Sequence, residues 1–397
     1  MEKHKEKLKE GQIKIITFLS FLFGFSQSLL IYIMSNYFEI ASGMKNVGVF
    51  YLVAYIISLT ILLNLHKFVK KFGRSNVLNF SLILKVIIIV FLAIYPPGWS
   101  AVLLLIFYII CSNLSWVSLD MILESCSRDS KSGRIRGKYL TIMNLGYFIG
   151  PFISTRILEK FDYTGIFLVL LVLNLFILFF ESANIRGSEC RLKEEVSIKS
   201  LLVKIIKRKN ICRIFYISFV LDFFYALMVI YVPIHLLGLG LGWDKIGIIF
   251  TAMLLPFIFL QYPAGILADK KTGEKEMLAV AIIIMGISAS IIYFISSTGI
   301  LIWSLILFSS RIGAALVEIL RDSYFYKRID GYDVDMIDFF KTAEPFAYIV
   351  AAILSAFVIY IFSVKAVFIL IGVVALSALY PIFRLKDNKT ETEIAKK

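Results

Sequence analysis

Charge is scarce in this sequence, and that scarcity excludes an ordinary soluble protein. Only 18% of the 397 residues are charged and 59% are hydrophobic, and the mean hydropathy is +0.84. A soluble domain could not cover its surface with so few polar groups. We therefore expect the chain to lie in a membrane.

Cysteine and histidine are also rare. The four cysteines show no paired spacing, so the sequence indicates neither a disulfide framework nor a zinc site. The three histidines lie near the N-terminus or at the edges of apolar segments, which argues against a proton relay built on a central histidine.

Motifs of common enzymes and pumps are missing as well. The sequence has no Walker-type phosphate loop, no His/Cys metal set and no serine-nucleophile elbow. We therefore expect neither an enzyme nor an ATP-driven pump, and no bound cofactor or metal.

Long apolar segments dominate what is present. Each is about 18 residues or longer, enough to cross a hydrocarbon core roughly 30 Å thick. They predict an all-α membrane protein with twelve transmembrane helices in two pseudo-symmetric six-helix bundles. The expected spans are 13–35, 46–66, 76–95, 99–123, 138–158, 163–181, 210–233, 245–266, 277–296, 299–321, 336–361 and 365–384.

The polar stretches between these spans define the expected domains. One long charged stretch separates the two halves and is interpreted as a cytoplasmic linker, either a partly helical tether or an amphipathic helix on the inner membrane surface. The predicted organisation is a cytoplasmic segment 1–12, a bundle 13–181, a linker 182–209, a second bundle 210–385 and a cytoplasmic tail 386–397.

Basic residues are distributed unevenly between the loops. With the N-terminus placed in the cytoplasm, only Lys45, Lys160, Lys245 and Lys365 of the 42 basic residues fall in the outer loops. This is the positive-inside pattern, which predicts cytoplasmic termini and the inner membrane of the cell. The net charge of +14 is thus a topology signal, with some anionic-lipid contact. Nucleic acid is not an expected partner.

The two halves repeat each other at an offset of close to 200 residues. Lys70–Gly73 recurs as Lys270–Gly273, and Asp120 recurs as Glu318. Internal symmetry in an apolar chain is typical of transporters whose halves rock about a site at the midplane.

One loop in the second half carries a recognisable motif. Its glycines, acid and bases are Gly265, Asp269, Lys270, Gly273 and Lys275. The run resembles the signature loop of the major facilitator superfamily, which that family uses as a conformational latch. The first-half copy keeps Gly73 and Arg74, but Leu65 and Val69 replace the expected glycine and aspartate, so its charged latch should be weak.

The expected fifth span contains spaced glycines that end in a proline. Gly137, Gly146, Gly150 and Pro151 resemble the motif of the superfamily's antiporters, although Ser154-Thr155 replace its last two glycines. Glycines four residues apart let helices approach closely, and this spacing is also common in ordinary helix packing. The motif favours export, and proton-coupled uptake of a nutrient remains the alternative.

The expected tenth span carries Arg311 and Glu318, which share a helix face because they are two turns apart. Charges at membrane depth are costly and should face a cavity or a partner. The resemblance implies an arginine for proton transfer on the fourth span, where Asn113 stands instead. Asp120, together with Arg321 and Asp322, could equally form ordinary salt bridges at the helix ends.

Asp222 lies near the centre of the expected seventh span among aromatic residues. Burial there disfavours the carboxylate and a nearby base favours it, so the group could bind and release a proton. The alternative is a structural pair with Lys85 or Arg311. The predicted proton-coupling network is Asp222, Arg311, Glu318, Asp120 and Glu344.

Polar and aromatic residues on other spans are candidates to line a substrate cavity. Each taken alone could also be a packing residue. They are Gln27, Lys85, Asn113, Trp116, Asn144 and Tyr225.

Together these patterns predict a secondary active transporter that moves a small organic solute by alternating access. We expect proton-driven export by a monomer whose partners are the solute, protons and the lipid bilayer. A proton-coupled uptake symporter, a facilitator and a non-transporting sensor are the alternatives.

Overall fold

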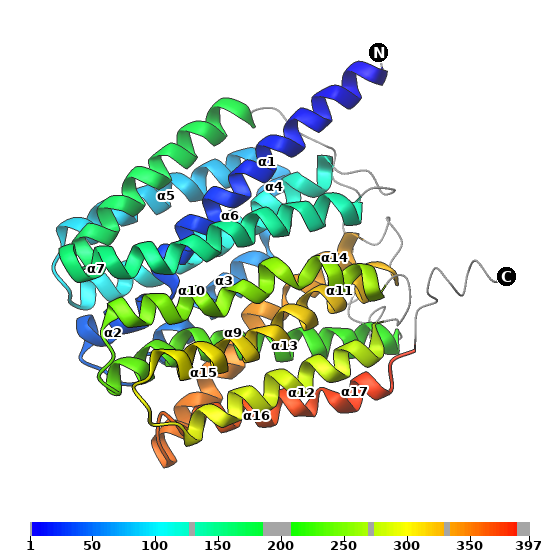
Figure 1. The fold of residues 1–397 in the computed structure, drawn as a ribbon. Coiled ribbons are helices and arrows are strands. Elements are labelled where there is room, and N and C mark those ends of the chain that lie inside the picture. The colour runs from blue at the N-terminus through cyan, green and yellow to red at the C-terminus, as the bar shows by residue number, and fades with distance from the viewer. Residues whose placement is uncertain (1, 127–131, 186–207, 269–273, 329–333, 387–397) are drawn as a thin grey trace. The chain divides into compact units, whose positions relative to one another are not determined.

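The computed structural model describes residues 2–126, 132–185, 208–268, 274–328 and 334–386. All the regular secondary structure in these ranges is helical, and they contain no β-strand. The expected all-helical fold class is confirmed (Figure 1).

Ten helical segments of the described chain are long and apolar enough to cross a membrane. One of them, Lys138–Asn184, contains Asp162, whose φ of 54° and ψ of −164° interrupt the helix. This break lies between the expected spans 138–158 and 163–181. The helix Gly48–Leu63, at 16 residues, is shorter than the other candidates. The total of twelve spans stays a prediction.

The chain divides into two compact units. The first comprises Met1–Lys193 with Gly242–Gly247, and the second comprises Glu194–Leu241 with Ile248–Lys397. Most of the predicted linker 182–209 and nearly all of the predicted tail lie outside the described residues, so the domain boundaries remain predictions.

In the first unit, α1 packs against α7, α5 packs against both α6 and α7, and α3 packs against α6. Leu19, Phe23, Leu82 and Ile122 are buried together where α1, α5 and α6 meet. The helices are α1 (Glu2–Ile31), α2 (Met34–Ser42), α3 (Gly48–Leu63), α4 (Leu65–Phe72), α5 (Arg74–Ile94), α6 (Trp99–Cys126) and α7 (Ser132–Asn184).

In the second unit, α9 is the central helix, because it packs against α13, α15 and α16. In α9, 83% of the most apolar stretch is buried, while no other candidate span exceeds 61%. The elements are α9 (Lys209–Gly238), α10 (Trp243–Phe259), α11 (Gln261–Leu267), α12 (Lys275–Ile291), the 3₁₀ turn η2 (Ile292–Phe294), α13 (Ile300–Tyr326), α14 (Val334–Lys341), α15 (Ala343–Ile361), α16 (Ala366–Ser377) and α17 (Leu379–Phe383).

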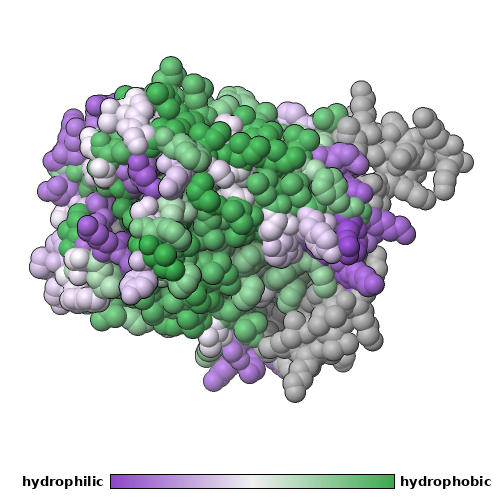
Figure 2. All heavy atoms as spheres, turned by 90° about the horizontal axis from the view of Figure 1, so that it is seen from below, coloured by the Kyte–Doolittle hydropathy of each residue, from purple (hydrophilic) through white to green (hydrophobic). Residues whose placement is uncertain are grey.

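Large apolar side chains cover the outside of the helices. On α5, the exposed residues Phe80, Ile83, Ile87, Phe91 and Ile94 follow the three- and four-residue spacing of one helix face. Figure 2 shows apolar residues over much of the visible surface. Such a surface suits contact with lipid and explains why so few polar residues are needed.

Candidate functional site

The main polar site of the second unit is centred on Asp222, near the middle of α9. The Arg321 guanidinium of α13 reaches it, with Nη1 3.2 Å from both carboxylate oxygens. The same nitrogen donates to Ser218 Oγ at 2.5 Å and to the Ser218 carbonyl at 3.3 Å. Ser218 and Asp222 are one helical turn apart, so they present a common acceptor face to Arg321.

A second carboxylate shares the same arginine. Arg321 Nε lies 3.6 Å from Asp322 Oδ1, and all three side chains are largely buried, with exposed fractions of 14% for Arg321, 9% for Asp222 and 20% for Asp322. Arg321 therefore has one carboxylate partner on α9 and another on its own helix.

Glu318 lies one turn before Arg321 and is held by neutral donors. Tyr225 Oη of α9 donates to Glu318 Oε2 at 3.0 Å, and Gln261 Nε2 of α11 donates to the same oxygen at 3.3 Å. Helices α9, α11 and α13 thus meet at this carboxylate. We call Ser218, Asp222, Tyr225, Gln261, Glu318, Arg321 and Asp322 the α9–α13 network.

Arg311, two turns before Glu318 on α13, has aromatic partners. Its Cζ lies 5.1 Å from the Phe224 ring centroid and 5.4 Å from that of Tyr225, a distance at which a cation is attracted to a ring face. Its Nε has no hydrogen-bond partner in the described chain.

The structure corrects the alternative partner assignment for Asp222. The sequence pattern offered Lys85 or Arg311, whereas the observed partner is Arg321. The reason is geometric, because Arg321 contacts the Ser218 and Asp222 face of α9 while Arg311 lies over the rings of Phe224 and Tyr225.

The other two members of the predicted coupling network are more accessible than Asp222. Asp120 is half-buried on α6 of the first unit, and Glu344 is exposed in the first turn of α15. Whether either takes part in coupling stays a prediction.

Three of the predicted cavity residues make contacts within their own units. In the first unit, Lys85 Nζ lies 6.0 Å from the Phe23 ring centroid, and Trp116 packs edge-on against the same ring at 5.4 Å. In the second unit, Tyr225 joins the α9–α13 network.

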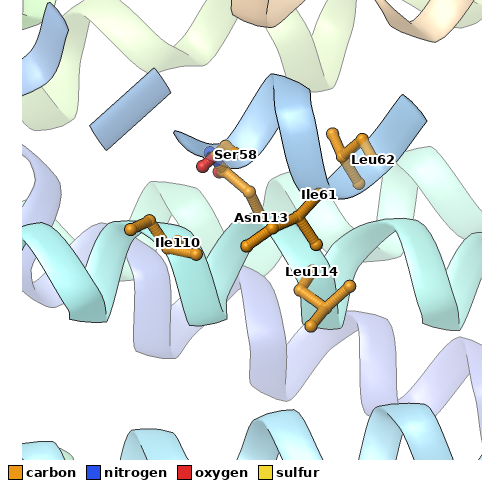
Figure 3. A pocket seen from close by; sticks show the side chains of 6 residues that line it. All are labelled: Ser58, Ile61, Leu62, Ile110, Asn113 and Leu114. Carbon is orange, nitrogen blue, oxygen red and sulfur yellow. Dashed lines mark hydrogen bonds between the residues drawn. The ribbon is translucent and has the colours of Figure 1, made fainter. Parts of the chain in front are cut away.

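Asn113 lines a shallow hollow between α3 and α6 (Figure 3). Its Nδ2 donates to Ser58 Oγ at 3.3 Å, and aliphatic side chains form the rest of the lining. Gln27 is half-buried with Oε1 lacking a partner among the described residues, and Asn144 is half-buried on α7.

The fifth-span glycines lie on α7 at its contact with α1. A Cβ at Gly146 would collide with the Phe21 carbonyl and come within 2.8 Å of Phe25 N, and one at Gly150 would overlap the Ser28 side chain. Gly24 of α1 faces the Met143 carbonyl in the same way. The two helices therefore touch backbone to backbone. Gly137 and Pro151 also lie within α7.

The signature loop of the second half is only partly described, since Asp269, Lys270 and Gly273 lie outside the described residues. Gly265 on α11 faces Ile319, and Lys275 begins α12.

In the first-half copy, Gly73 has a φ of 83° at the junction of α4 and α5, a conformation that suits glycine. Arg74 Nη1 donates to the Met121 carbonyl at 3.3 Å, which ties this loop to α6.

Sequence reasoning overlooked some residues that the structure brings into these contacts. Glu274 is 1% exposed and accepts from Lys327 Nζ at 2.6 Å and Ser323 Oγ at 3.0 Å, which ties the signature loop to α13. Gln261 was also missed, although a lone amide inside the apolar run before the loop was a usable signal.

These observations define a class of protein: a helical integral membrane protein of two units whose apolar helices contain buried charges. Residues 13–329 match the family model described as Major Facilitator Superfamily, and the chain belongs to that family. It is therefore a membrane transporter, and this membership supports a transport role over an enzymatic one. No curated protein matches the sequence.

Proposed function

We propose that this protein is a proton-coupled exporter of a small organic solute, working by alternating access in the inner membrane of the cell with both termini in the cytoplasm. The observation that carries the proposal is the buried contact between Asp222 of α9 and Arg321 of α13. Proton coupling needs a carboxylate whose two protonation states favour different contacts, and this one fits that need.

The shared arginine supplies a mechanism. When Asp222 takes up a proton, Arg321 loses its carboxylate partner on α9 and keeps Asp322 on its own helix. The contact between α9 and α13 is then weaker, and release of the proton from Asp222 restores the ion pair. Proton occupancy is thereby linked to the contact between two helices of one unit.

The direction of transport is proposed from the glycine motif of α7. Its resemblance to the antiporter motif, carried by Gly146, Gly150 and Pro151, supports exchange of cytoplasmic solute for external protons. No metal or organic cofactor enters this mechanism, because the proton gradient supplies the driving force.

Flux measurements test the proposal. The full chain is reconstituted in liposomes containing a pH-sensitive dye, a pH gradient is imposed, and a panel of small organic anions, cations and neutral compounds is added. We expect at least one compound to move against its gradient in exchange for protons that move in the opposite direction, down theirs. Asp222→Asn should abolish proton-driven accumulation while leaving downhill exchange.

Glu276→Gln is the matched control, because Glu276 is an exposed acid in the first turn of α12. It should behave as the wild type. Proton-driven transport that survives in Asp222→Asn would refute the coupling role. Flux in the import direction in oriented vesicles would refute export, and movement of no compound would favour the sensor alternative.

A further inference from the structure

Lys85 is a buried cation in the first unit. It lies on α5 with 2% of its surface exposed, and its ammonium nitrogen is 4.9 Å from the Tyr108 ring centroid and 6.0 Å from that of Phe23. It makes no hydrogen bond or ion pair with any residue that the structure describes. Aromatic faces attract the ammonium group but cannot replace an anionic partner.

Other donors around Lys85 are also unpaired. Tyr108 Oη and Ser112 Oγ, one turn apart on α6, are buried and lack hydrogen-bond partners in the described chain. Ser26 of α1 and Ser112 flank the Tyr108 hydroxyl without forming a bond of normal geometry. Buried polar groups normally form hydrogen bonds, so this group of donors without acceptors requires an explanation.

Among the residues that the structure describes, no acid of the surrounding helices forms an ion pair with Lys85. Glu181 of α7 accepts from Asn79 Nδ2 at 2.9 Å, and Asp120 lies three turns beyond Tyr108 on α6. Asn174 Oδ1 of α7 also lacks a partner among the described residues, but an amide oxygen is neutral and cannot compensate the charge.

We propose that Lys85, Tyr108 and Ser112 bind the negatively charged group of the transported solute, and that the substrates are organic anions bearing a carboxylate. This inference rests on the proposed transport function and names its substrate class. A carboxylate offers only acceptors, which complements one ammonium group and two hydroxyls. Phe23 and Trp116, packed against each other beside Lys85, provide an aromatic surface for the apolar part of the solute.

The second unit contains a comparable arrangement. Arg311 is 2% exposed and lies over the rings of Phe224 and Tyr225, with no ion pair to a described residue. Each unit thus contains a buried cation that is held by aromatic rings and lacks an acidic partner in the described chain. This recurrence favours an anionic solute over a cationic one.

Thermal unfolding of the purified full chain tests the site. The probes are benzoate, benzylamine and benzyl alcohol, which share a ring and differ in charge, together with acetate, phosphate and chloride. We expect benzoate to raise the unfolding temperature of the wild type, because a ligand that binds only the folded state stabilises it. Benzylamine and benzyl alcohol should have no such effect.

Substitutions then locate the binding group. Lys85→Met keeps an unbranched side chain, one heavy atom shorter, and removes a buried charge, so it should fold at least as stably as the wild type. It should bind benzoate roughly ten- to a hundredfold more weakly, the loss expected for a charged hydrogen bond. Lys85→Arg should retain most of the affinity, and Tyr108→Phe should lose part of it. Lys45→Met is the control at an exposed lysine.

The outcomes separate the substrate class from the transport function. Benzoate that stabilises Lys85→Met as well as the wild type, or no stabilisation by any anion, overturns the site. Full stabilisation by chloride alone overturns the organic-anion class in favour of a small inorganic ion. Transport of benzylamine but not benzoate leaves the transport function intact and overturns the inference. Lys85-dependent benzoate binding without flux of any compound supports the site and refutes the transport function.

Discussion

At the scale of single residues, Arg321 forms ion pairs with two carboxylates of the α9–α13 network. It lies between Asp222 on one helix and Asp322 on its own. Removing one member of a buried ion pair leaves the other charge without compensation, which costs far more than the pair itself contributes.

We predict that Arg321→Met lowers the free energy of unfolding by about 3–5 kcal/mol, because Asp222 is then buried without its partner. The double variant Arg321→Met, Asp222→Asn should recover most of this loss. Thermal unfolding of detergent-purified protein measures both. A single variant as stable as the wild type, or a double variant no better than the single one, would contradict the role given to the pair.

Individual residues also show which parts of the site could be predicted from the sequence alone. Asp222 was identifiable because an acid inside an apolar span is conspicuous. Its partner was not, because the contact with Arg321 joins positions 99 residues apart and helix periodicity fixes only the face on which a residue lies. The contact between Gln261 and Glu318 could not be predicted for the same reason, since the two residues lie on different helices.

At the scale of helices, the contact between α1 and α7 is defined by glycine. Gly24, Gly146 and Gly150 each face backbone or side-chain atoms of the opposite helix. The sequence predicted that the α7 glycines allow close approach, and the structure adds that α1 is the helix approached. Spacing in one helix cannot identify its neighbour.

We predict that Gly146→Leu destabilises the protein by about 1–3 kcal/mol or more, since any side chain there must displace the backbone near Phe21. Gly11→Ala is the matched control, because a Cβ at Gly11 of α1 meets nothing within 4 Å. It should be neutral or add up to about 1 kcal/mol through helix propensity. Equal unfolding temperatures for the two variants would show that the contact is not close in solution.

Helix length was harder to predict than helix position. The span expected at 46–66 corresponds to α3, which ends at Leu63, after which α4 begins as a separate helix. The expected spans 138–158 and 163–181 correspond to two helices within α7, which are separated by the non-helical backbone of Asp162. A hydropathy pattern shows how long an apolar segment is. It does not show at which residue one helix ends and the next begins.

At the scale of the whole molecule, the fold class followed from composition and the family from a few spaced motifs. The orientation in the membrane is predicted from the uneven distribution of lysine and arginine. Lys45 and Glu276 are both exposed and belong to loops or helix ends predicted to face opposite sides of the membrane.

We predict that Lys45→Cys reacts with a membrane-impermeant maleimide in intact cells, whereas Glu276→Cys reacts only after the cells are permeabilised. The background for both is the chain with its four native cysteines replaced by serine or alanine. The positive-inside pattern gives the expected direction. The opposite labelling pattern would invert the topology and with it the direction of transport.

The glycine contact has a mechanical consequence for the first unit. A helix rises about 1.5 Å per residue, so a slip of one residue would bring side chains to the points where Gly24 and Gly146 now touch carbonyl oxygens. Because the backbones are in direct contact at Gly24 and Gly146, α1 and the adjoining part of α7 should resist sliding and move together as one rigid pair of helices. Elastic deformation during the transport cycle must then be taken up by other helix contacts.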